Sequence, residues 1–154
     1  EELMLMANVA VARHFKEKDI PALYRIHEEP ASEAIGNFES FLKAFGYGQR
    51  VTGGGHLQKK ISRALEHFRD HPKSHVLNML ALRSLAQAKY SANNVGHFGL
   101  GFADYTHFTS PIRRYPDLIV HRLLKATLKL RGGYRLMEQS ELETAGTMLS
   151  ACEQ

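Results

Sequence analysis

The sequence contains a single cysteine among 154 residues and lacks any long apolar run. A lone cysteine, Cys152, excludes a disulfide within the chain and is typical of a reducing compartment, so we expect a cytoplasmic location. No apolar stretch approaches the ~20 residues that cross a bilayer. The N-terminus also shows neither a signal-peptide pattern nor a lipidation motif. We therefore expect no contact with a membrane.

Clustered aspartates are also missing. Two-metal hydrolysis of a phosphodiester commonly uses several carboxylates around ions ~4 Å apart. The four aspartates are Asp19, Asp70, Asp104 and Asp117, and no two of them lie closer than 13 positions. The nine histidines include no HExxH pair, and core or hydrogen-bonded histidines are a better interpretation than a zinc site. We predict no metal site made by this chain alone.

The glycines form no nucleotide-binding fingerprint. Gly53-Gly54-Gly55 is not followed by Lys-Ser/Thr, and Gly99-x-Gly101 lacks a third glycine. The first run is typical of a flexible loop, and the second of a place where two backbone segments approach closely.

Apolar residues recur at helical spacing along most of the sequence, so we predict a mainly helical α+β fold with a few short strands. A short strand is expected at 23–27, a turn at 90–94, and two short strands or extended loops at 97–102 and 105–109. In the helix that follows Ser110, Pro111 is expected in the first turn and Gly132-Gly133 at the stop. The expected helices cover about 1–16, 31–45, 56–69, 73–89, 112–131 and 139 onwards.

Cations are concentrated around the helix expected at 112–131. Six of them, against the single acid Asp117, fall between Arg113 and Arg131. Adjacent arginines at a helix entrance favour an anion, and the aromatic rings just before them suit single-stranded RNA, whose bases stack while its phosphates pair with cations. The ordinary alternative is a solvated basic face on an amphipathic helix. The face in question is expected to carry Arg114, His121, Arg122, Lys125 and Lys129.

Three groups of residues resemble one known family. The longest is Tyr105–Leu118, reading YTHFTSPIRRYPDL, which lies between HFGL at 97–100 and HRLL at 121–124. The start, EELMLMAN at 1–8, and YRIHEEP at 24–30 resemble two further motifs in the same order. Together they resemble the C-terminal half of the RNB catalytic domain of the ribonuclease II/ribonuclease R family, with the greatest likeness to its bacterial ribonuclease R members.

That resemblance implies a processive 3′→5′ exoribonuclease that releases nucleoside 5′-monophosphates from single-stranded RNA with Mg²⁺. Residues 1–154 would be the C-terminal part of the catalytic domain. The metal-binding aspartates and the RNA-binding domains of the family would lie upstream of Glu1 or outside this stretch. A further catalytic glutamate would fall past Gln154. The rest of the RNB domain and single-stranded RNA are thus the expected partners.

The resemblance also implies roles for individual residues. Arg113 would be catalytic and would contact the phosphate at the cleavage site, and Glu1 would contact the ribose of the 3′-terminal nucleotide. Alone, the chain is expected to bind RNA weakly and to hydrolyse none. Two alternatives remain open, a non-catalytic RNA-binding or assembly module and a helical interaction domain with merely solvated charges. The full set of expected RNA-binding residues is Glu1, Tyr105, His107, Thr109, Ser110, Arg113 and Arg114.

Overall fold

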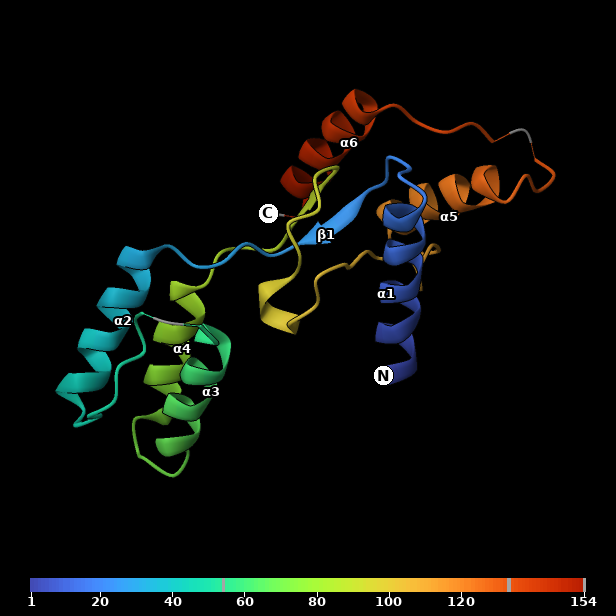
Figure 1. The fold of residues 1–154 in the computed structure, drawn as a ribbon. Helices are drawn as coiled ribbons and strands as arrows, with labels where there is room; N and C mark the ends of the chain where they lie inside the picture. Colours follow the sequence, from blue (N-terminus) through green and yellow to red (C-terminus); the bar gives the residue numbers. More distant parts are fainter. Residues whose placement is uncertain (54, 133, 154) are drawn as a thin grey trace. The chain divides into compact units, whose positions relative to one another are not determined.

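The computed structural model describes residues 1–53, 55–132 and 134–153, and the chain divides into two compact units (Figure 1). One unit is formed by Glu1–His27 together with Ala88–Gln154, and the other by Glu28–Gln87. The expected glycine loop at 53–55 and the expected helix stop at 132–133 include Gly54 and Gly133, which lie outside the described residues.

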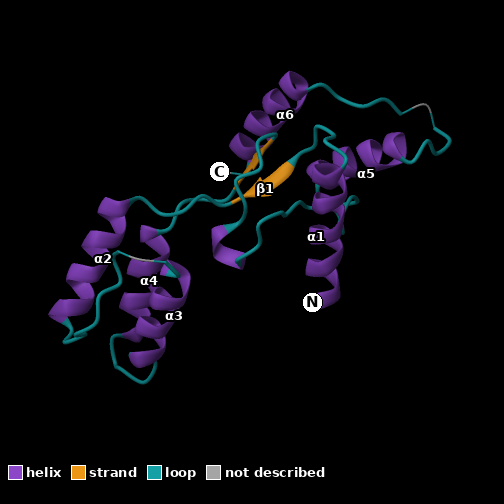
Figure 2. Cartoon of the chain, viewed as in Figure 1, coloured by secondary structure: helices purple, strands orange, loops and turns teal. Residues whose placement is uncertain are grey.

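The first unit combines helices with a two-stranded antiparallel sheet (Figure 2). The register of the sheet pairs Arg25 with Tyr90. These elements confirm the prediction of a mainly helical α+β fold. In chain order they are α1 (Glu2–Glu17), β1 (Tyr24–Ile26), β2 (Lys89–Ser91), the 3₁₀ turn η1 (Phe98–Leu100), α5 (Tyr115–Thr127) and α6 (Gln139–Cys152).

The core of this unit lies where α1, α5 and α6 contribute apolar side chains beside the sheet. α6 packs directly on β2: a Cβ added at Gly146 would lie 2.9 Å from the Tyr90 carbonyl oxygen, so only glycine permits this approach. Each helix presents side chains at helical spacing. The fully enclosed helix side chains include Ala12, Phe15, Val120, Leu123 and Leu142, and Leu23, just before β1, is enclosed with them.

The second unit consists of three helices, α2 (Ser32–Ala44), α3 (Leu57–His67) and α4 (Ser74–Ser84). Ile35, Phe38 and Leu42 follow helical spacing along the buried side of α2. The carboxylate of Glu39, which is 5% exposed, accepts hydrogen bonds from the backbone N–H groups of Val51 and Thr52 at 2.9 and 2.6 Å. This buried acid fixes the loop that follows α2.

Two predicted boundaries are wrong around residues 85–94. The helix expected at 73–89 ends at Ser84, because Leu85 has an extended backbone. The expected turn at 90–94 begins instead as strand β2. Its three residues are too few to show a strand pattern. The strand exists because β1 pairs with it and because Ser150 of α6 accepts from the Tyr90 N–H at 2.8 Å.

The helix after Ser110 also starts later than predicted. α5 begins at Tyr115, so Pro116, and not Pro111, occupies its first turn. In a helix over 112–131, Ile112 and Tyr115 would share the inward stripe of Ile119, but they are 103% and 55% exposed. The helix ends at Thr127, before the expected glycine stop. Its buried side comprises Pro116, Asp117, Ile119, Val120 and Leu123.

The segment from 97 to 109 is held without regular strands among its described residues. It contains η1 and isolated bridges of His97 with His27 and Phe102. At 105–109 the loop alternative is therefore correct, whereas the strand or extended loop expected at 97–102 is wrong, because this stretch folds into the turn η1. No helix in the described part of the chain is both long and apolar enough to cross a membrane.

Candidate nucleic-acid interface

The turn from Ser110 to Arg114 is closed by its own backbone and by one buried acid. The Ser110 carbonyl accepts from the N–H groups of Arg113 and Arg114 at 3.3 and 3.0 Å. The Asp117 carboxylate, in the first turn of α5, accepts from the Ser110 N–H through Oδ1 at 2.8 Å. Because Asp117 is 0% exposed, this acceptor is shielded from water, which strengthens the bond.

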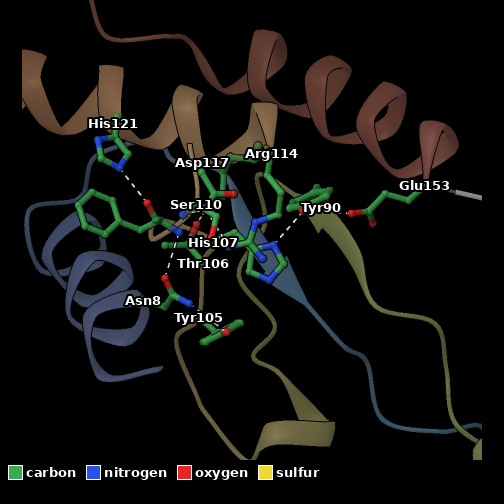
Figure 3. A network of polar contacts seen from close by, with 12 residues as sticks. Asn8, Tyr90, Tyr105, Thr106, His107, Ser110, Arg114, Asp117, His121 and Glu153 are labelled. Carbon is green, nitrogen blue, oxygen red and sulfur yellow. Dashed lines mark hydrogen bonds and ion pairs between the residues drawn. The ribbon is translucent and has the colours of Figure 1, made fainter. Parts of the chain in front are cut away.

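The two adjacent arginines have different surroundings, and Figure 3 shows Arg114 beside Asp117. Nη2 of Arg114 donates to Oδ1 of Asp117 at 2.8 Å, and the Arg114 side chain is 20% exposed. Arg113 is exposed and makes no side-chain hydrogen bond or ion pair with any described residue. Of the two cations expected at the helix entrance, one is therefore neutralised internally and the other is available to an anion.

Asn8 of α1 holds the segment that precedes the turn (Figure 3). Its side chain, 2% exposed, donates from Nδ2 to the Tyr105 hydroxyl at 3.1 Å and accepts from the Phe108 N–H at 3.0 Å. Thr106 donates from Oγ1 to the Leu23 carbonyl at 2.6 Å. One buried amide thus bridges a helix to two residues of the loop.

His121 of α5 holds the same loop from the other side. Its Nε2 donates to the Phe108 carbonyl at 2.8 Å, and its ring stacks on the Phe108 ring with centroids 4.2 Å apart. His121 was expected on an outward basic face with Arg114. Both of these side chains are used internally, so the exposed part of that face is narrower than predicted and consists of Arg122, Lys125 and Lys129.

His107 lies in a network that reaches the end of α6 (Figure 3). Its Nδ1 is 2.8 Å from the Tyr90 hydroxyl, which donates to Oε1 of Glu153 at 3.2 Å. The Tyr90 oxygen is then free to accept from His107 Nδ1. Glu153 also pairs with Arg25 at 2.5 Å, and the Arg25 guanidinium lies 4.6 Å from the centre of the Tyr90 ring.

Burial is the main reason that this histidine is uncharged at neutral pH. It lowers the pKa of His107 to about 4, and the nearby charges of Arg114 and Arg25 act in the same direction. Burial also raises the pKa of the Tyr90 hydroxyl. Both groups are neutral at pH 7, so they offer hydrogen bonds and no charge.

The structure brings most of the predicted residues into one loop. Thr109, Ser110, Arg113 and Arg114 belong to the same turn, and His107 lies three residues before Ser110. Tyr105 is only 5% exposed and its hydroxyl is bonded to Asn8, so its ring supports the loop from inside. Glu1 is exposed at the entrance to α1.

Sequence analysis missed the residues that fix this loop, chiefly Asn8, Tyr90 and Asp117. Asn8 and Asp117 each follow an apolar helical stripe as a polar residue on its buried side, which is a usable signal. Tyr90 is an aromatic residue between Lys89 and Ser91, but a pattern of three residues is too short to predict its burial. Among the described residues, no three His, Cys, Asp or Glu side chains gather to hold a metal ion.

The chain belongs to the RNB domain family, whose profile matches residues 1–130. Among relatives, it is 46% identical to ribonuclease R of Thermotoga maritima over 141 residues, 92% of this chain and 20% of that protein. It is 47% identical to ribonuclease R 1 of Lactococcus lactis over 81% of the chain, 15% of that protein. The chain thus spans 15% and 20% of the length of these two relatives.

Solved structures give the same fold. Ribonuclease R of Mycoplasma genitalium in complex with ribose-methylated single-stranded RNA matches 98% of this chain and 24% of its own, with a TM-score of 0.81 and 31% identity. Yeast Ssd1, described as a pseudonuclease, matches 98% of this chain and 19% of its own, with a TM-score of 0.78 and 25% identity. The fold therefore occurs both in nucleases and in a protein described as lacking that activity.

Proposed function

We propose that this chain forms one wall of the active site of an exoribonuclease, which degrades single-stranded RNA processively from the 3′ end to nucleoside 5′-monophosphates. The observation that carries the proposal is the contrast between Arg114, which is paired with a buried carboxylate, and Arg113, which is exposed on the same closed turn. A cation displayed on a fixed turn suits a phosphate. The family and the relatives named above support the reaction class.

Arg113 is proposed as the catalytic residue of this wall. During hydrolysis, negative charge develops on the phosphoryl oxygens, and a guanidinium that is already in place stabilises it without rearrangement. Thr109, Ser110 and Arg114 shape the turn that carries Arg113. His107 and Tyr105 support the loop segment just before it.

Glu1 is proposed to accept a hydrogen bond from a ribose 2′-hydroxyl, which would distinguish RNA from DNA. It precedes Asn8 by seven residues, so the two lie on nearly the same face of α1, roughly 10 Å apart along the axis. Because Asn8 contacts the loop, that face of α1 is the one directed to the interface.

The part of this chain that the structure describes contains no suitable site for the Mg²⁺ ions of the proposed reaction. Mg²⁺ requires clustered oxygen ligands, and no such group of acidic side chains forms there. We propose that residues outside this chain, in the rest of an RNB domain, hold the metal. The chain then supplies binding and charge stabilisation, and other segments supply the ions.

A second function, a non-catalytic RNA-binding or assembly module, is favoured by two observations. The described residues offer no metal cluster, and the same fold occurs in the yeast pseudonuclease. In that case Arg113 would bind a phosphate backbone without any cleavage, and its contribution would appear only as salt-dependent affinity.

A chimera distinguishes the two functions. This chain would replace the matching stretch of Thermotoga maritima ribonuclease R, and single-stranded RNA labelled either throughout or at its 5′ end would be followed with Mg²⁺ or with EDTA. With Mg²⁺ only, we expect release of mononucleotides from the uniformly labelled RNA, and conversion of the 5′ label to a short end product without accumulation of intermediate lengths. We expect no hydrolysis by the 154-residue chain alone. A folded, RNA-binding but inactive chimera would favour the module. Mononucleotide release by the chain alone would overturn the division of roles.

A further inference from the structure

Asp117 is the residue that makes the two neighbouring arginines different. Its Oδ1 accepts hydrogen bonds both from the Ser110 N–H and from Arg114 Nη2, each at 2.8 Å, so one oxygen ties the start of the turn to its end. The carboxylate is fully enclosed at the start of α5. A buried carboxylate requires a cationic or N–H partner, and here it has both.

Arg113 and Arg114 occupy different parts of this structure. Residues 111–113 form the turn that closes on the Ser110 carbonyl, and Arg114 follows it with an extended backbone, φ −126° and ψ 117°. Asp117 holds the Arg114 side chain inward, whereas Arg113 is exposed on the turn just before it. The carboxylate therefore fixes both the inward arginine and the turn that carries the exposed one.

We propose that Asp117 is a positioning residue of the interface, which acts through Arg114 and Ser110 to present Arg113 to the phosphate. This inference rests on the proposed nuclease function. Asp117 itself touches neither RNA nor metal in this account. Its effect is transmitted by the two hydrogen bonds of a single oxygen.

The other oxygen of Asp117 makes a sharp experiment possible. Oδ2 is buried and has no hydrogen-bond partner among the described residues. In an Asp117→Asn variant the amide nitrogen can occupy the place of Oδ2, and the amide oxygen can keep the place of Oδ1. The variant preserves the shape and the Oδ1 acceptor and removes the negative charge that retains Arg114, while it adds an amide N–H₂ group at the buried place of Oδ2.

The test uses the active chimera described above, with Asp104→Asn as the matched control. Asp104 is a buried acid, 8% exposed, paired with Lys16 at 2.7 Å, and it does not contact the turn. We expect Asp117→Asn to lower kcat by about 100-fold, with KM changed by less than about threefold, because a misplaced catalytic group costs rate more than ground-state binding. Asp104→Asn is expected to leave kcat within about threefold.

A double-mutant cycle separates positioning from a general structural role. Arg113→Ala and Asp117→Asn/Arg113→Ala are expected to have the same kcat, since Asp117 has nothing left to position once the guanidinium is gone. Additive losses, or an unchanged kcat in Asp117→Asn, would overturn the inference. An Asp117→Asn chimera that is unfolded at the assay temperature would also count against the inference. In that case Arg114→Met tests the same ion pair by removing its cation, and the same loss of kcat is expected. An inactive parent chimera would instead refute the proposed function.

Discussion

Replacement of Asn8 by leucine tests whether α1 holds the interface loop by polar contacts. Asn8 is 2% exposed and makes two hydrogen bonds, at 3.1 Å to the Tyr105 hydroxyl and at 3.0 Å from the Phe108 N–H. Leucine has a similar volume, so it leaves little cavity but satisfies neither group. Each lost partner is worth about 1–3 kcal/mol when the remaining group stays buried, so we expect about 3 kcal/mol of destabilisation in the first unit.

Two measurements read this effect. Urea unfolding followed by tyrosine fluorescence gives the free energy, since the chain has six tyrosines and no tryptophan. Amide hydrogen exchange reports the loop directly, because the Phe108 N–H loses its acceptor and is expected to exchange much faster. Asn93→Ala, at an exposed position, is expected to stay within about 0.5 kcal/mol of the parent. An Asn8→Leu protein as stable as the parent, with Phe108 still protected, would refute the reasoning.

Three further predictions concern packing and pH. Gly99→Ala is expected to destabilise the protein by about 1–3 kcal/mol, because the added Cβ would lie 2.6 Å from Nδ1 of buried His27. Gly36→Ala, which meets no obstruction within α2, is expected to stabilise the protein by about 0.5–1 kcal/mol. Thermal unfolding compares the two variants, and equal effects would contradict this packing. The pKa of Glu39 is lowered to about 2, chiefly by a hydrogen bond from Lys43. The second unit should therefore lose stability as pH falls from about 4.5 towards 2, and Glu39→Gln should remove most of that dependence. Urea unfolding measured at several pH values tests this prediction. ¹⁵N NMR of His107 should show a neutral ring at pH 7 that protonates only near pH 4, and a midpoint at the usual 6.5 would show that the ring is not buried.

The helices were predictable where apolar spacing is regular. α1, α2, α3 and α6 lie within a few residues of their predicted ranges, because burial of one stripe decides both the pattern and the structure. Strand β2 was not predictable, since its three residues are held by pairing with β1 and by contact with α6, which are distant in sequence. Local sequence patterns do not predict such long-range contacts.

The start of α5 shows how two similar local signals compete. Pro111 and Pro116 are both suited to a first helical turn, and the spacing alone favours the earlier one. The structure uses Pro116, because Asp117 one residue later can then accept from the Ser110 N–H and close the preceding turn. That bond depends on burial of the carboxylate, which is a tertiary property.

The interface was partly predictable for the same reason. The run of residues around Arg113 and Arg114 indicates an anion site, but the sequence treats the two arginines alike. Their difference comes from a carboxylate that is fully enclosed only when α5 packs on the core. The resemblance to the RNB family implies that Arg113, and not Arg114, contacts the phosphate. The pairing of Arg114 with Asp117 supports that proposal with a physical reason.

The most direct test of the account is the activity of the chimera with Arg113→Ala, measured beside Arg63→Ala, an exposed arginine on α3 outside the turn and the basic face. Loss of a group that stabilises transition-state charge is expected to lower kcat by about 100- to 1,000-fold, while Arg63→Ala keeps kcat within about threefold. If the two variants instead lose activity equally, or if Arg113→Ala retains full kcat, Arg113 is not the residue that meets the scissile phosphate.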